Sequence, residues 1–235
     1  MSAIGILGGM GPQASAKLHE LLIKGTQKYT PAAALDDDYP EIVLLNVPVP
    51  NFISNENELP KAKQILLDRT KLLEKAGCTV SGIACNTAHI LLPELQAVTK
   101  VPFLPIQTIV AKRVEIAGFK QVGLLATPTT LGSRLYDDAL SGIADIVRPD
   151  IDFAKQIEQF IYKQLNDKLT ESGRRLFKEQ VTKFKLTNNL DAVILGCTEL
   201  PLVYGESLND ETVLDTLQIL SDGLLASYFD TNYIG

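Results

Sequence analysis

The sequence predicts an α/β protein with two duplicated halves, each a mainly parallel sheet flanked by helices. Short apolar runs alternate with longer amphipathic segments along the 235 residues, which is the pattern of parallel strands joined by helices. The order of these segments then repeats. Val122 follows Ile4 by 118 residues and Cys197 follows Cys85 by 112, so the offset is similar at two points of the repeat.

Four apolar runs of the first half are predicted to form strands. They span 4–8, 41–47, the run that ends at Cys85, and 101–106. Helices are predicted after the glycine loop at 8–12, over about 59–76, where Gly77 ends the helix, and over 91–99. Residues 30–39 are predicted to be a loop. Its acidic run at 36–38 is interpreted as solvated surface, because a metal site would need oxygen ligands from elsewhere.

The second half is predicted to repeat this order with strands over 121–126 and 145–148 and a third that ends at Cys197. Helices are predicted over 132–139, 153–168 and 173–188. The last helix, near 212–228, has no clear place in the second copy, so we expect it to pack on the first. The first domain would then consist of 1–104 and 213–235, and the second of 105–212.

Composition and charge exclude several classes of function. The chain is 46% hydrophobic, which suits a globular core, and its net charge of −6 without a basic stripe argues against nucleic acid. No apolar run approaches the ~18 residues of a membrane span. The N-terminus has no basic segment typical of a signal peptide. Three scattered cysteines are too few for a disulfide or zinc framework, so we predict a cytoplasmic protein.

Two cysteines end strand-like runs in the same local pattern. Cys85 is followed by Asn-Thr and Cys197 by Thr-Glu. A single cysteine there would usually be a packed core residue, but the shared pattern favours a functional pair. Ligands of open α/β folds bind outside the carboxyl ends of the strands. One thiolate can remove a proton from a carbon acid while the other thiol protonates the opposite face. Cys78 lacks this context and is interpreted as structural.

The glycine loop formally fits a dinucleotide fingerprint. Residues 9–14 match G-x-G-x-x-A, after a predicted strand and before a predicted helix. The second strand, however, ends at Asn46-Val47-Pro48, without the acidic residue that binds the ribose. A small carboxylate held by the same loop is therefore the preferred interpretation, and a nucleotide the alternative.

Polar residues cluster at the predicted strand ends. Each threonine there is either a cap or turn residue or a hydroxyl for a polar ligand, and the set comprises Thr87, Thr127, Thr129, Thr130 and Thr198. His89 is interpreted as a residue of the first helical turn. Glu199 has two interpretations, a helix-start carboxylate or a group that orients a substrate amine or influences the thiol of Cys197.

Three motifs together resemble the aspartate/glutamate racemase family, most closely its aspartate racemase branch. They are Gly-Gly-Met-Gly-Pro at 8–12, Cys-Asn-Thr-Ala-His at 85–89 and Gly-Cys-Thr-Glu-Leu at 196–200. The resemblance implies two pseudo-symmetric lobes with the active site between them, and a homodimer. It also implies racemisation of an amino acid by Cys85 and Cys197, without a cofactor or metal.

The same resemblance implies the substrate-binding residues, which are Met10, Asn86, Thr87, Thr127, Thr130, Thr198 and Glu199; Ser133 and Tyr136 also match the family pattern. One position departs from it. Many aspartate racemases carry an Asp-Arg pair after the second strand, whose Arg grips the substrate carboxylate, and this chain has Asn51-Phe52. Asn166 stands at the likely position of a lysine, with Lys163 and Lys168 nearby. The expected substrate therefore has a neutral or bulkier side chain.

Two other functions fit the same residues. Isomerisation or decarboxylation of a small dicarboxylate would use the same fold and thiols. A non-catalytic small-molecule-binding protein would keep the pocket, although binding alone requires neither cysteine.

Overall fold

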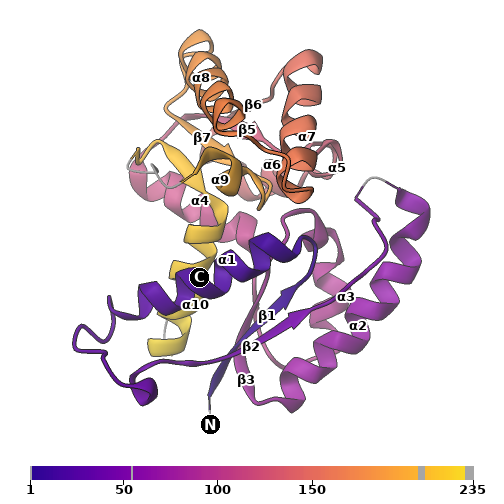
Figure 1. Cartoon of the computed structure of the whole chain (residues 1–235), viewed down its shortest axis with the longest axis vertical. Helices are drawn as coiled ribbons and strands as arrows, with labels where there is room; N and C mark the ends of the chain where they lie inside the picture. Colours follow the sequence, from indigo (N-terminus) through magenta and orange to yellow (C-terminus); the bar gives the residue numbers. More distant parts are fainter. Residues whose placement is uncertain (1, 54, 206–209, 231–235) are drawn as a thin grey trace. The chain divides into compact units, whose positions relative to one another are not determined.

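The structure is a computed structural model that describes residues 2–53, 55–205 and 210–230 (Figure 1). The chain divides into two compact units. Unit 1 consists of Met1–Ile109 and Leu217–Gly235, and unit 2 of Val110–Thr216. Within the described residues each unit contains one parallel sheet of four strands. The α/β class and the pair of parallel sheets predicted from the sequence are confirmed.

The sheet of unit 1 has the strand order β2-β1-β3-β4. Its strands are β1 (Ala3–Gly8), β2 (Glu41–Asn46), β3 (Cys78–Ile83) and β4 (Phe103–Leu104). All six residues of β1 are buried, because helices cover both faces of the central strand. Parallel pairing aligns Gly8 with Asn46 and Leu7 with Ile83, so the carboxyl ends of the three longer strands lie at one edge.

Helices of unit 1 pack on opposite faces of this sheet. They are α1 (Pro12–Thr26), α2 (Leu59–Lys75), α3 (Leu92–Gln96) and α10 (Thr216–Phe229), with the 3-10 turns η1 (Asp36–Asp38), η2 (Glu56–Glu58) and η3 (Thr87–Leu91). A Cβ on Gly5 would lie 3.3 Å from Leu73 of α2. On the other face, a Cβ on Gly82 would lie 3.0 Å from Leu224 of α10. Glycine at these positions lets the helices approach the strands closely.

Unit 2 repeats the topology with the strand order β6-β5-β7-β8. Its strands are β5 (Gln121–Leu125), β6 (Asp145–Val147), β7 (Ala192–Leu195) and β8 (Val213–Asp215). Its helices are α5 (Pro128–Gly132), α6 (Leu135–Leu140), α7 (Ile151–Leu165), α8 (Glu171–Thr187) and α9 (Leu200–Tyr204). A further helix, α4 (Ile106–Ala117), starts in unit 1 and continues into unit 2. Identical strand order supports the duplication inferred from the sequence offsets.

The structure corrects several element boundaries. The strand predicted over 101–106 spans only Phe103–Leu104, because Ile106 already begins α4. The helix predicted over 132–139 begins at Pro128 and is interrupted at Arg134, whose φ of 61° is left-handed, which gives α5 and α6. The helix predicted from 212 is wrong at its start, because residues 213–215 form β8, paired with β7. The helical piece predicted over 91–99 is preceded by the 3-10 turn η3 and ends earlier, at Gln96.

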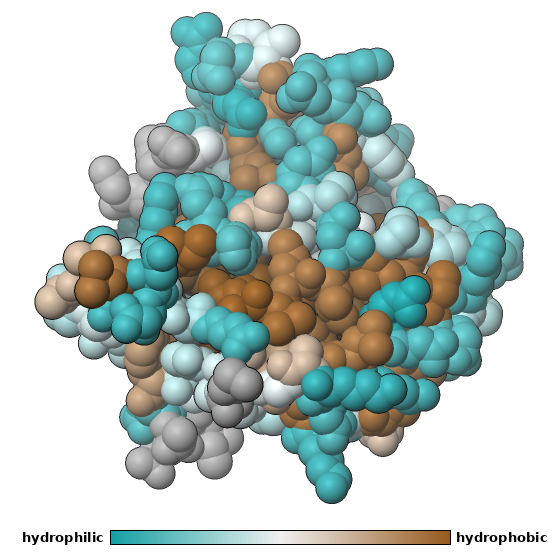
Figure 2. Space-filling model, turned by 60° about the horizontal axis from the view of Figure 1, so that its bottom comes forward, coloured by the Kyte–Doolittle hydropathy of each residue, from teal (hydrophilic) through white to brown (hydrophobic). Residues whose placement is uncertain are grey.

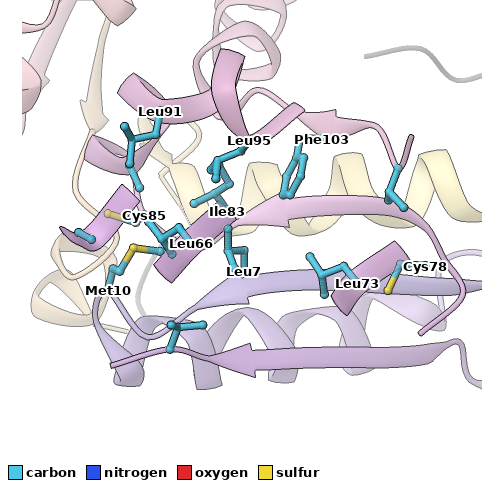
Figure 3. Packing of buried hydrophobic residues seen from close by; sticks show 14 of the residues in the cluster. Leu7, Met10, Leu66, Leu73, Cys78, Ile83, Cys85, Leu91, Leu95 and Phe103 are labelled. Atoms are coloured by element: carbon cyan, nitrogen blue, oxygen red, sulfur yellow. The ribbon is translucent and has the colours of Figure 1, made fainter. Parts of the chain in front are cut away.

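A hydrophobic cluster joins the sheet of unit 1 to α2 and α3. Figure 3 shows Leu7, Leu66 and Leu73 among its members, with Cys78 at one end and Cys85 at the other. Burial raises the pKa of the Cys78 thiol, and Glu41 adds to the shift, so this cysteine is a packed thiol as predicted. The cluster therefore connects the core to the edge of the sheet where Cys85 lies.

The surface features of the described residues add no further site. The acidic run forms η1, and the Asp38 carboxylate accepts the N–H groups of Ala34 and Leu35, which lowers its pKa. Figure 2 shows a broad band of apolar residues across one face, with hydrophilic residues around it. Exposed large apolar side chains such as Leu35 and Ile116 come from different elements, so we assign no binding role to them. In the described chain every helix is too short or too polar to cross a membrane.

Candidate active site

The glycine loop after β1 has a fixed conformation. Gly9 has a φ of +98°, and a Cβ there would lie 2.4 Å from the backbone N and O of Val47. The Gly9 N–H donates to Ser15 Oγ at 2.9 Å, and Ser15 Oγ donates to the Gly11 carbonyl at 2.9 Å. Because Ser15 is buried on α1, these two bonds hold the loop and Met10 against the helix. No motif of the glycine loop includes Ser15, so its role could not be predicted from the sequence.

The loop that carries Cys85 leaves the sheet one residue after β3. The Ala84 N–H donates to the Leu7 carbonyl at 3.0 Å, which extends the pairing with the central strand. Cys85 follows directly and is 3% exposed. Asn86 and Thr87 are buried as well and lead into η3. The thiol therefore lies at the carboxyl edge of the sheet, as the pattern of the sequence predicts.

His89 is buried and has a structural role. Its Nε2 accepts the backbone N–H of Ile106 at 3.1 Å, so Nδ1 carries the proton and donates to the Cys85 carbonyl at 2.8 Å. Burial lowers the pKa of His89 to about 4, so the ring is neutral near pH 7. Its place in η3 confirms the interpretation as a residue of the first helical turn.

The loop that carries Cys197 repeats this backbone arrangement. The Gly196 N–H donates to the Leu125 carbonyl at 2.7 Å, as Ala84 does to Leu7 in unit 1. A Cβ on Gly196 would lie 2.7 Å from the end of the Leu124 side chain, so an alanine there would make that side chain shift. Cys197 follows directly, 7% exposed. Each cysteine is thus the second residue after the third strand of its unit.

The thiol of Cys197 is hydrogen-bonded to a carboxylate. Cys197 Sγ donates to Glu199 Oε2 at 3.0 Å, and Thr198 Oγ1 donates to the same oxygen at 3.2 Å. Glu199 is 4% exposed, and a carboxylate this buried needs such donors. Two residues after Cys85 the chain has Thr87 instead. The geometry favours the interpretation in which Glu199 influences the thiol.

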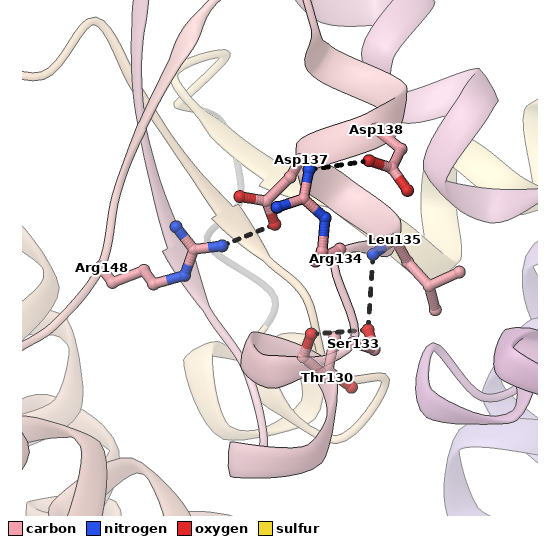
Figure 4. A network of polar contacts seen from close by, with 7 residues as sticks. All are labelled: Thr130, Ser133, Arg134, Leu135, Asp137, Asp138 and Arg148. Carbon is pink, nitrogen blue, oxygen red and sulfur yellow. Dashed lines mark hydrogen bonds and ion pairs between the residues drawn. The ribbon is translucent and has the colours of Figure 1, made fainter.

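Threonines after β5 form a second polar group in unit 2. Thr127 Oγ1 accepts the Thr130 N–H at 3.3 Å, which caps α5, and donates to Thr130 Oγ1 at 3.1 Å. Ser133 Oγ donates to the Thr130 carbonyl at 2.8 Å (Figure 4). An ion pair of 2.6 Å between Arg148 and Asp137 ties α6 to the end of β6 (Figure 4). The cap interpretation of Thr127 is therefore correct, whatever ligand its hydroxyl also meets.

Tyr136 on α6 is a buried neighbour of Cys197. It is 1% exposed, and its pKa is raised by burial first and by the charge of Cys197 second. Only the family pattern singles out Tyr136, because a tyrosine in a short helix carries no signal of its own.

The position expected to hold an arginine holds a core residue. Phe52 is 2% exposed and belongs to the hydrophobic cluster that includes Met10, Val47 and Cys85. Its ring is packed in the hydrophobic core and is not exposed on a loop. In unit 2, Asn166 caps the end of α7 and donates from Nδ2 to the Tyr162 carbonyl at 2.8 Å, while Lys163 lies 5.9 Å from the Phe160 ring.

Each unit gathers its candidate residues beyond the carboxyl ends of its own strands. Unit 1 contributes Met10, Cys85, Asn86 and Thr87; unit 2 contributes Thr127, Thr130, Cys197, Thr198 and Glu199. All of these residues are buried. Another residue that no motif predicts is Gln107 of α4, whose Nε2 donates to the Asn86 carbonyl at 3.2 Å.

Comparison with known proteins places this arrangement in a family. A family model described as Asp/Glu/Hydantoin racemase matches residues 7–222. A broad specificity amino-acid racemase of Bacillus subtilis (strain 168) is 26% identical over 225 residues, which are 96% of this chain and 97% of the relative.

Solved structures agree with that match. An aspartate racemase of Picrophilus torridus superposes with a TM-score of 0.75 at 30% identity, over 97% of this chain and 94% of its own. An aspartate racemase homologue of Pyrococcus horikoshii OT3 gives a TM-score of 0.77 at 27% identity, over 96% and 98%. On its two duplicated sheets, its paired cysteine loops and these matches, the chain belongs to the Asp/Glu/Hydantoin racemase family.

Proposed function

We propose that this protein racemises an amino acid with Cys85 and Cys197 as the two acid/base groups, without a cofactor. The observation that carries the proposal is the equivalence of the two cysteine loops. Both follow the third strand of sheets with the same strand order, and both leave the sheet through the same backbone hydrogen bond to the central strand. A duplication that keeps a thiol at the same point of both copies suits a reaction with two equivalent proton transfers.

The reaction requires one thiolate and one thiol. The thiolate removes the α-proton, so the C–H bond breaks, an S–H bond forms and the electron pair stays on the substrate, delocalised into its carboxylate. The other thiol then gives its proton to the opposite face of the same carbon and becomes the thiolate. The reverse sequence converts the other enantiomer. Backbone N–H groups and threonine hydroxyls at the strand ends are suited to stabilise the carboxylate as charge develops on it.

Glu199 makes the two cysteines differ in their initial protonation state. Its carboxylate accepts a hydrogen bond from Cys197 Sγ at 3.0 Å, so a base is available to take the thiol proton and leave a thiolate. Thr87, two residues after Cys85, offers no such base. We propose that, for one of the two enantiomers, Cys197 is the base that removes the α-proton and Cys85 is the acid that protonates the opposite face.

The substrate side chain is proposed to be neutral. Phe52 replaces a bidentate carboxylate partner and lies in the same apolar cluster as Met10 and Cys85. A carboxylate side chain placed there would lose its hydration without gaining a cation. The broad specificity of the Bacillus subtilis relative fits this choice. The homodimer stays a prediction, which light scattering of the purified protein tests.

Proton exchange tests the proposed function. The protein is incubated in deuterium oxide with each of a panel of D- and L-amino acids, and α-deuteration and optical rotation are followed. We expect racemisation of neutral amino acids, and its loss in both Cys85→Ala and Cys197→Ala. Cys78→Ala, which removes the packed thiol, is the matched control and should keep activity. Normal racemisation by both Cys85→Ala and Cys197→Ala would contradict the two-thiol mechanism.

The alternatives give other results when malonate-type substrates are added to the panel and thermal stability is also measured. Carbon dioxide released from a malonate-type substrate, without racemisation, would indicate a decarboxylase. Thermal stabilisation by an amino acid without any exchange of its α-proton would indicate a binding protein.

A further inference from the structure

The start of α4 is hydrogen-bonded to the loop that carries Cys85. The Ile106 N–H donates to His89 Nε2 at 3.1 Å, and His89 Nδ1 donates to the Cys85 carbonyl at 2.8 Å. Beside this relay, Gln107 Nε2 donates to the Asn86 carbonyl at 3.2 Å. The consecutive carbonyls of Cys85 and Asn86 thus each accept a hydrogen bond from a buried side chain.

These contacts lie in a buried part of unit 1. His89 is 1% exposed, Gln107 4% and Asn86 2%. Without the His89 ring the Cys85 carbonyl and the Ile106 N–H would lose these partners, which is costly inside a protein. The Asn86 carbonyl also accepts the backbone N–H of His89 at 3.2 Å, so Gln107 gives it a second donor that ties it to α4. The ring of His89 is neutral near pH 7, because burial lowers its pKa to about 4, so its donor and acceptor sides are fixed.

The second unit has a related contact at the corresponding helix. Thr216 is the first residue of α10, the helix that follows the fourth strand, as Ile106 is of α4. Its Oγ1 donates to the carbonyl of Leu195, two residues before Cys197, at 2.9 Å, and it is fully buried. In unit 2 this bond reaches the last residue of β7, whereas in unit 1 the bonds reach the cysteine loop itself.

We propose that His89 and Gln107 are positioning residues that hold the Cys85 loop in the geometry needed for proton transfer. The proposal rests on the proposed function, because it assigns Cys85 a proton to transfer. Gln107 lies outside all motifs of the sequence, and His89 lies inside one without an assigned role. Both act through the backbone of the loop and not on the substrate.

The chain offers a matched control for Gln107. Gln96 also joins backbone groups of unit 1: its Nε2 donates to the Thr99 and Val101 carbonyls at 3.2 and 3.1 Å, and its Oε1 accepts the Phe103 N–H at 2.9 Å. Gln96 makes at least as many side-chain hydrogen bonds as Gln107, but none of them reaches the Cys85 loop. Gln96→Leu therefore reports the cost of losing a structural glutamine.

Kinetics on the most rapidly racemised amino acid provide the first readout. Gln107→Leu is expected to lower kcat about 10- to 100-fold, because small displacements of a reacting group have costs of this order, while KM stays within about threefold. Gln96→Leu is expected to lower the melting temperature at least as much and to leave kcat within about twofold. Equal kcat in the two variants would overturn the proposal.

Alkylation of the thiols provides a readout that needs no turnover. The rates at which iodoacetamide modifies Cys85 and Cys197 in the folded protein are measured by peptide mass spectrometry. In Gln107→Leu the Cys85 rate should rise about fivefold, the factor expected from one lost hydrogen bond, and the Cys197 rate should not change. If the wild type racemises nothing, the proposed function fails while this readout still decides whether the loop is held.

A variant of His89 covers the case in which Gln107→Leu does not fold. His89→Asn keeps an amide nitrogen near the position of Nδ1, able to donate to the Cys85 carbonyl, and loses the acceptor for Ile106. It should retain more kcat than His89→Leu. Faster Cys85 alkylation with unchanged kcat, or equal kcat in the two His89 variants, would contradict a positioning role.

Discussion

The burial of His89 predicts how the stability of the protein depends on pH. Burial lowers the pKa of His89 from 6.5 to about 4 and outweighs the carbonyls of Cys85, Leu104 and Asn86, which raise it. The unfolded chain keeps a value near 6.5, so between pH 4 and 6.5 the unfolded state binds more protons. The contribution of this residue is therefore fully present above pH 6.5 and is lost as the pH falls towards 4.

The magnitude follows from the size of the shift. Lowering the pKa of His89 from 6.5 to about 4 corresponds to about 3 kcal/mol in total, of which about 2 kcal/mol is lost between pH 7 and pH 5. The pKa values of the Asp191 and Asp210 carboxyl groups are also shifted, but they are lowered from 3.8. Their contributions to stability are therefore lost only at lower pH. The change in the free energy of unfolding between pH 7 and pH 5 therefore reports the titration of His89.

Urea unfolding at pH 5, 6 and 7 measures this contribution. The free energy of unfolding of the wild type should fall by about 2 kcal/mol over the window, and that of His89→Asn by less than about 0.5 kcal/mol, because the asparagine does not titrate. A wild type equally stable at pH 5 and 7, or a variant with the same slope as the wild type, would refute the buried neutral imidazole.

Three further predictions concern the site. Glu199→Gln should lower kcat about 10²- to 10⁴-fold because it removes the base at the Cys197 thiol. Thr198→Val, which removes the other donor to the same oxygen, should cost only about fivefold, and equal losses measured by steady-state kinetics would contradict the base. Gly9→Ala should lower the free energy of unfolding by at least about 1–3 kcal/mol, from its φ of +98° and the contact with the Val47 backbone. An unchanged urea midpoint would speak against that constraint. Phe52→Ala should lower the free energy of unfolding by about 3–5 kcal/mol, and Phe52→Leu by less than about 1.5 kcal/mol. A loss below about 1 kcal/mol for the alanine would place the ring outside the core.

Strands β1, β5 and β7 could be predicted because they are buried almost throughout and therefore read as continuous apolar runs. The spacing of Ile106, Ile109, Val110 and Val114, all buried, is that of one helix face, so α4 was visible in the sequence although it was not assigned. β8 was not visible, because three residues are too few for a periodic signal. The break at Arg134 depends on a left-handed residue that the sequence does not specify.

The candidate site likewise contains residues that could be predicted from the sequence and residues that could not. Cys85, Cys197 and the threonines stand directly after predicted strands, so their place at the sheet edge follows from the topology. Gln107 acts on Asn86, 21 residues earlier, through a contact that only the fold creates. Ser15 likewise serves the glycine loop from the first turn of the next helix. Such residues carry no local pattern, because what selects them is a neighbour in space.

The isotope content of substrate and product at early times tests the two-thiol mechanism most directly. One enantiomer is incubated in deuterium oxide, and both enantiomers are separated and analysed by mass spectrometry before a tenth of the substrate has reacted. We expect deuterium at Cα in the product and protium in the remaining substrate, because one thiol removes the proton and the other delivers a deuteron from the opposite face. Protium retained in the product, or deuterium entering the unreacted enantiomer at the same rate, would show a single base and contradict the paired roles of Cys85 and Cys197.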